Sequence, residues 1–96
     1  MACALDVSSG LFGLTFAGKA EALQDVAGSY DLTIRKSGRS GSAVIQQAGE
    51  FRLRAGQTEI LGEATLSGDP SEFDAELTVN VGGKRFTCRP RGSIEL

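Results

Sequence analysis

A stretch near the end of the chain, residues 73–91, reads FDAELTVNVGGKRFTCRPR and predicts a β-hairpin. Apolar and polar residues alternate before Gly82-Gly83, which is the period of a strand with one buried face. The two glycines supply the positive φ angles of a two-residue hairpin turn. This turn fixes the register, because a slip by one residue would invert both faces. The expected cross-strand pairs are Val81–Lys84, Asn80–Arg85, Val79–Phe86, Thr78–Thr87, Leu77–Cys88 and Glu76–Arg89.

Further short segments with strand composition, separated by turn residues, fill most of the remaining sequence. The expected strands cover residues 3–8, 11–23, 30–36, 43–47, 51–54 and 57–67. Turns are expected at Ala27-Gly28-Ser29, Ala48-Gly49 and Gly68-Asp69-Pro70, and a loose tail over residues 90–96. A helix over residues 19–26 is the alternative for that segment, but eight uncapped residues form only a marginal helix.

Three glycines within the predicted strands indicate irregular positions. Gly13 or Gly18 is expected to bend the second strand, and Gly62 is expected to mark a bulge in the strand over residues 57–67. In that strand Ile60, Ala64 and Leu66 are the expected core residues, and Leu61 falls on the opposite face.

Seven or eight short strands at a spacing of about ten residues are typical of an all-β, immunoglobulin-like two-sheet sandwich. With 96 residues, the chain is expected to form a single domain over residues 1–96. A small barrel is the alternative. The sequence has no Trp, so it lacks the core Trp of antibody domains.

The only two cysteines, Cys3 and Cys88, are both expected to point inward from terminal strands. This arrangement suggests a disulfide between the first and last strands, with two unpaired buried thiols as the alternative. A disulfide would indicate an oxidising compartment. The start of the chain lacks the segments of a signal peptide, and we expect the sequence to be the mature part of an exported protein.

Several classes of chemistry have no residues to support them in this sequence. The chain has no His, which excludes His-based catalysis and His metal sites, and two distant cysteines make no zinc site. No phosphate-binding glycine motif and no apolar run of membrane-spanning length occurs. The acidic residues Asp69, Glu72, Asp74 and Glu76 are interpreted as a solvated face rather than as a catalytic or calcium site. We therefore expect no enzyme activity, no catalytic residue, no metal and no cofactor.

The net charge of −2 conceals strong local charge. Residues 1–34, 35–54, 55–80 and 81–96 carry net charges of −3, +4, −6 and +3. Several basic residues could share one face of a sheet, although a mixed surface with scattered cations is the alternative. Nucleic-acid binding would require more positive charge and exposed stacking aromatics, so no nucleic-acid partner is expected.

The segments YDLTIRKSGRSGSAVIQQAGEFRLRAGQTEILGEATL and FDAELTVNVGGKRFTC resemble the CsgH family of curli-subunit chaperones, which is related to CsgC. The shared pattern is a strand ending in RKSG, a Gly-Ser loop, a GEFxL element, an ILGE strand and a closing hairpin with a terminal Cys. It spans residues 28–88. The C-x-C pair of CsgC is missing here, so the resemblance does not imply thiol redox chemistry.

The resemblance implies a monomeric periplasmic chaperone that keeps an unfolded curli-type amyloid subunit from polymerising early, through transient electrostatic contacts. An exposed strand edge that pairs with the client is a second possible route. A structural or adhesive module of a surface assembly is the alternative function. The candidate client-binding residues are Arg35, Lys36, Arg39, Arg52, Arg54, Lys84 and Arg85.

Overall fold

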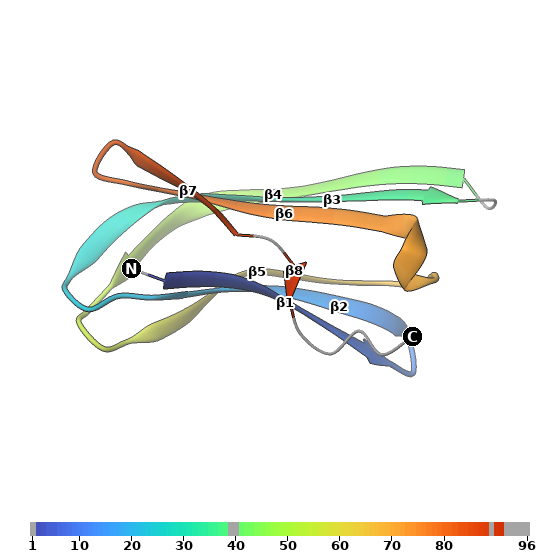
Figure 1. The fold of residues 1–96 in the computed structure, drawn as a ribbon, viewed down its shortest axis with the longest axis horizontal. Coiled ribbons are helices and arrows are strands. Elements are labelled where there is room, and N and C mark those ends of the chain that lie inside the picture. Colours follow the sequence, from blue (N-terminus) through green and yellow to red (C-terminus); the bar gives the residue numbers. More distant parts are fainter. Residues whose placement is uncertain (1, 39–40, 89, 92–96) are drawn as a thin grey trace.

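Two four-stranded sheets face each other in the computed structural model, which describes residues 2–38, 41–88 and 90–91 (Figure 1). The first sheet has the order β5 (Thr58–Leu66), β2 (Gly13–Glu21), β1 (Ala2–Gly10) and β8 (Pro90–Arg91). The second sheet has the order β4 (Gly41–Leu53), β3 (Val26–Gly38), β6 (Phe73–Val81) and β7 (Lys84–Cys88). A short 3₁₀ helix, η1 (Pro70–Glu72), joins the sheets. The predicted two-sheet sandwich of immunoglobulin-like type is confirmed.

The β6–β7 hairpin has the predicted register throughout the described residues. Its pairs run from Val81–Lys84 at the turn to Leu77–Cys88, and Gly82 and Gly83 both have positive φ angles, of 57° and 78°. The sixth expected pair involves Arg89, which lies outside the described residues. A local turn signal and a period of two were therefore sufficient to specify this hairpin.

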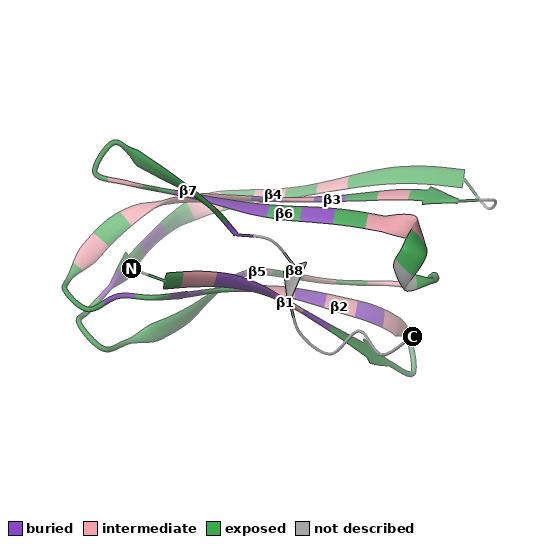
Figure 2. Cartoon of the chain, in the orientation of Figure 1, coloured by how far each residue is buried: buried purple, intermediate pink, exposed green. Residues whose placement is uncertain are grey.

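The core lies between the sheets, where the inward-facing side chains of both layers are buried (Figure 2). The largest of the fully buried side chains are Leu5, Val7, Leu32, Ile34, Leu53, Leu61, Leu77 and Val79. They come from five strands, because alternate residues of each strand point toward the opposite sheet. The other face of each sheet is left to solvent.

Two predicted turns are wrong, because residues 27–29 lie inside β3 and residues 48–49 lie inside β4. β3 and β4 pair over thirteen residues without a shift, so the expected strands over residues 43–47 and 51–54 belong to one strand, which ends at Leu53. Gly28 sits where a Cβ would collide with the carbonyl oxygen of Asn80, and a Cβ at Gly49 would lie 3.1 Å from the Tyr30 ring. These two glycines allow close packing within the sheet; they do not terminate strands.

The prediction that Ile60 belongs to the core is also wrong, since 54% of Ile60 is exposed while Leu61 is 2% exposed. The cause is a bulge between β2 and β5, where the register shifts between Ala17 and Lys19. Gly62 lies in this bulge with a φ of 84°, as predicted. The extra residue inverts the alternation, so Ala64 and Leu66 pack against the core as expected but Ile60 does not.

The remaining differences between the predicted and the observed ends of the strands are smaller. The second strand begins at Gly13 rather than at residue 11, and Leu11 and Phe12 form an exposed turn. Residues 19–26 contain no helix, and the register of β2 with β5 shifts at Gly18, between Ala17 and Lys19. The tail was expected to be loose, but Pro90 and Arg91 form β8, which pairs in parallel with Leu5 and Asp6 of β1. Residues 92–96 lie outside the described part of the chain.

Candidate interaction surface

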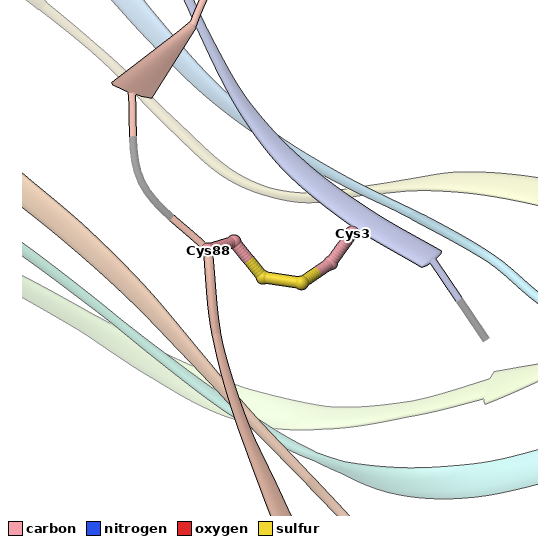
Figure 3. Close-up of a disulfide and its surroundings, with 2 residues drawn as sticks. All are labelled: Cys3 and Cys88. Atoms are coloured by element: carbon pink, nitrogen blue, oxygen red, sulfur yellow. A yellow bond between two sulfur atoms is a disulfide. The ribbon is translucent and has the colours of Figure 1, made fainter.

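The predicted disulfide between Cys3 and Cys88 is present (Figure 3). Cys3 lies on β1 of the first sheet and Cys88 ends β7 of the second, with their Cα atoms 5.9 Å apart. Cys88 is buried, and the chain passes from the second sheet to the first directly after it. The disulfide therefore closes one flank of the sandwich covalently.

The outward face of the second sheet carries three of the predicted client-binding residues, Arg35, Arg52 and Arg85. Arg35 lies on β3 opposite Val44, Arg52 lies on β4 opposite Ala27, and Arg85 lies on β7 opposite Asn80. All three are exposed, and none forms an ion pair within the described ranges 2–38, 41–88 and 90–91. Their guanidinium groups are thus available to a partner.

Acidic side chains are interleaved with these arginines. Asp74 pairs with Arg35 in the β3–β6 ladder, and Glu50 lies two residues from Arg52 on β4. The Asp31 carboxylate accepts hydrogen bonds of 3.1 and 3.3 Å from Nε2 of Gln46. The face is consequently a mixed-charge polar surface, and the local excess of positive charge in the sequence does not become one continuous basic patch.

Lys36 belongs to a different environment from Arg35. Its Nζ donates a 2.9 Å hydrogen bond to the carbonyl oxygen of Ser67 and lies 5.8 Å from the centre of the Phe73 ring. The Phe73 ring in turn packs against Phe16, with 5.4 Å between ring centres. Because it connects β3 with the segment after β5, Lys36 has a structural role that the sequence did not indicate.

The remaining predicted cations are dispersed. Lys84 occupies the tip of the β6–β7 hairpin, where its pairing with Val81 places it on the opposite side of the ladder from Arg85. Arg54 follows β4, and its backbone amide donates to the Oε1 atom of Gln57. Arg39 lies outside the described residues. The structure therefore brings three of the seven residues onto one face.

An open hollow of about 630 Å³ lies beside Arg52. Its lining consists of residues 27–29 of β3, residues 50–52 of β4 and Asn80 of β6. The small side chains of Ala27 and Ser29 leave room here for a partner's chain to approach the sheet. The sequence interpretation missed this feature because it assigned residues 27–29 to a turn; the signal available was a run of small residues within a strand.

Neither a metal site nor a membrane-spanning helix is found in the described part of the chain. No group of three or more His, Cys, Asp or Glu side chains there is placed to hold a metal ion. No helix there is long and apolar enough to cross a membrane.

Comparison with known proteins identifies the family. A sequence model described as "CsgH protein" matches residues 2–91, and no curated protein sequence matches. The solution structure of CsgH from R. palustris shares 31% identity with a TM-score of 0.73, over 90% of this chain and 86% of that one. The E. coli curli protein CsgC shares the fold, with a TM-score of 0.75 at 17% identity, over 88% of this chain and 92% of that one. Since the family pattern extends over nearly all of the sequence, the chain belongs to the CsgH family.

Proposed function

We propose that this protein is a periplasmic chaperone that delays the amyloid polymerisation of a secreted curli-type subunit, and that it is not an enzyme. Membership of the CsgH family is the observation that carries this proposal. The fold is shared with a protein named as a curli protein. The Cys3–Cys88 disulfide is typical of proteins that fold in an oxidising compartment such as the periplasm.

The outward face of the second sheet supports a transient electrostatic contact with the unfolded client. Arg35, Arg52 and Arg85 are exposed there without ion-pair partners among the described residues. Exposed charges of this kind accelerate encounter more than they increase affinity. A rapid, weak contact suits a chaperone that must act on many subunits and release each of them for export.

The first test is thioflavin T fluorescence during polymerisation of a curli-type subunit, with the protein added well below equimolar amounts. A longer lag time is expected, and an unchanged lag time at a 1:1 ratio would contradict the proposal. Inhibition should also weaken as salt rises, because charges are screened over about 8 Å at physiological ionic strength. The salt dependence of the subunit alone must be subtracted.

Two double variants with the same change of charge locate the contact. R35E/R52E reverses two arginines of the outward face, whereas R54E/K84E reverses Arg54, which follows β4, and Lys84, which lies on the opposite side of its ladder from Arg85. The first should weaken inhibition more than the second at low salt. Both should melt within about 10 °C of wild type and of each other, because exposed charges contribute about 0–1 kcal/mol each. Equal inhibition by the two variants would argue against a contact centred on this face.

A structural module of a surface assembly is the second candidate, favoured by one observation. β4 is an edge strand, paired on one side only, and such a strand can join a second copy of the chain. Sedimentation at micromolar concentration distinguishes the two functions. We expect a monomer, and self-assembly of the purified chain would favour the structural module.

A further inference from the structure

The four edge strands of the sandwich differ in how well they are protected against pairing with another chain. An edge strand presents unpaired backbone N–H and C=O groups, and proteins block such edges with short strands, bulges or charges. β8 has two residues, and β7 has five, of which the first two are Lys84 and Arg85. The two edges on the side of the sandwich that carries the disulfide, β7 and β8, are therefore short or charged.

β5 is longer but is protected in three ways. The bulge at Gly62 interrupts its regular geometry. The side chain of Gln47 covers its backbone at Glu63, donating from Nε2 to the carbonyl oxygen and accepting from the amide, each at 3.0 Å. Glu59 and Glu63 also add two negative charges to the strand. A further strand would have to displace the Gln47 amide and approach these carboxylates.

β4 has none of these protections over its first nine residues, Gly41–Gly49, with the sequence GSAVIQQAG. This segment contains no charge and no proline, and its ladder with β3 is regular. At about 3.3 Å per residue it offers an open edge of about 30 Å. Alternate residues of an antiparallel strand direct their backbone groups away from the partner strand, so about half of those on β4 face outward.

The composition of this segment indicates which partner fits. β-branched residues and amides without charge are the properties of strands that stack in cross-β assemblies, where Gln and Asn side chains form ladders. Gln46 is exposed and Val44 is 65% exposed, so both can meet a strand placed beside β4. An acidic or basic segment would find no charge partner on residues 41–49. An uncharged, amide-rich segment has no charge that needs a partner there.

We propose that the β4 edge over residues 41–49 binds an extended, uncharged, amide-rich segment of the amyloid subunit by strand addition. This inference rests on the proposed chaperone function and gives it a contact. The captured segment pairs its backbone with β4 instead of with another subunit. Its growth is then stopped on the far side of β4, because β3 already occupies that position.

Charge substitutions at matched positions on the two long edges test the proposal. Val44 on β4 and Ile60 on β5 are both β-branched and exposed, by 65% and 54%. V44K and V44E should each require at least about fivefold more protein for the same delay, because either charge blocks an edge. I60K and I60E should remain within about twofold of wild type, since β5 is already protected.

The signs of these effects separate strand addition from electrostatics. If V44K inhibits better than wild type while V44E inhibits less well, the contact is purely electrostatic and the edge proposal is overturned. If wild type delays polymerisation and all four variants do so equally, the edge proposal fails while the chaperone function stands. If wild type itself causes no delay, the chaperone function fails.

A second measurement does not depend on any substitution folding correctly. Hydrogen–deuterium exchange of the wild-type protein is followed with a nine-residue, uncharged peptide rich in Gln and Asn. The outward-facing amides of β4 between Ser42 and Ala48 should become protected, and amides of β5 should not. The same peptide with N-methyl groups on every backbone amide should give no protection, because it lacks the N–H donors of both edges. Equal protection by both peptides, protection elsewhere only, or dimerisation through β4 that excludes the peptide would overturn the proposal.

Discussion

The two flanks of the sandwich are closed by bonds of very different strength. On one flank the Cys3–Cys88 disulfide joins β1 to β7, and β8 continues the chain onto the first sheet. On the other flank, β4 and β5 are connected by the hydrogen bonds between Gln47 and the backbone of Glu63. This difference explains how a small sandwich can leave the outer edge of a long strand, β4, unpaired. The covalent flank holds the two sheets together, so the opposite flank is not required to be sealed.

Removal of the disulfide should lower the free energy of unfolding more than any other change considered. The bond closes a loop with a sequence separation of 85, and the chain-entropy model gives about 4–5 kcal/mol for such a loop. We expect C3A/C88A to lose most of that free energy of unfolding in urea and to melt at least about 15 °C below wild type, since each kcal/mol shifts a domain of this size by about 4–8 °C. Wild type in reductant should behave like the double variant. A loss below about 1 kcal/mol would mean that the core alone holds the flanks together.

Substitution of Gly62 in the bulge should lower the free energy of unfolding by an intermediate amount. Gly62 and Gly56 have similar φ angles, of 84° and 79°, but only Gly62 is crowded, because a Cβ there would lie 3.0 Å from Gln47 Oε1 and 3.1 Å from Leu32 Cδ2. G62A should therefore cost about 2–3 kcal/mol, and G56A about 1 kcal/mol, the cost of the left-handed conformation. Urea unfolding of both variants gives the comparison. Equal costs would show that packing at the bulge contributes nothing to protecting β5.

Loss of the Gln47 side-chain amide should have the smallest effect on stability. Q47A removes both hydrogen bonds to Glu63 and should cost about 1–2 kcal/mol, while accelerating hydrogen exchange of the Glu63 amide. Q46A is the matched control, because Gln46 is the adjacent glutamine and its side chain, among the described residues, binds the partly exposed Asp31 carboxylate. It should cost less than about 0.5 kcal/mol. If the Glu63 amide exchanges at the wild-type rate in Q47A, the side chain does not protect the β5 edge.

Much of the fold followed from local patterns. Alternation of apolar and polar residues predicted the faces of β6, and Gly82-Gly83 predicted its register with β7. Interpretation of the other glycines was less reliable. Gly62 was correctly assigned to a bulge, but Gly28 and Gly49 were assigned to turns. In the structure their missing side chains make room for Asn80 and Tyr30, which are remote in the sequence.

The candidate surface was predicted only in part. Position in a strand gave the outward direction of Arg35, Arg52 and Arg85, because side chains alternate between faces. It could not show that Lys36 reaches Ser67 and the Phe73 ring, since those contacts join β3 to segments that are remote in the sequence. Whether Arg35 and Arg52 contact a client is a prediction that the double variants test.

By itself, the sequence determined the β6–β7 register and correctly predicted the all-β sandwich and the Cys3–Cys88 pairing, because each depends on local alternation or on two inward cysteines. The tertiary structure alone decided which strands lie at an edge. Among the described residues, β4 and β5 each have one neighbouring strand, and β5 is covered because Gln47 extends across to it. Edge position and edge protection depend on which strands pair and on contacts between sheets, and neither is encoded in the period of a single strand.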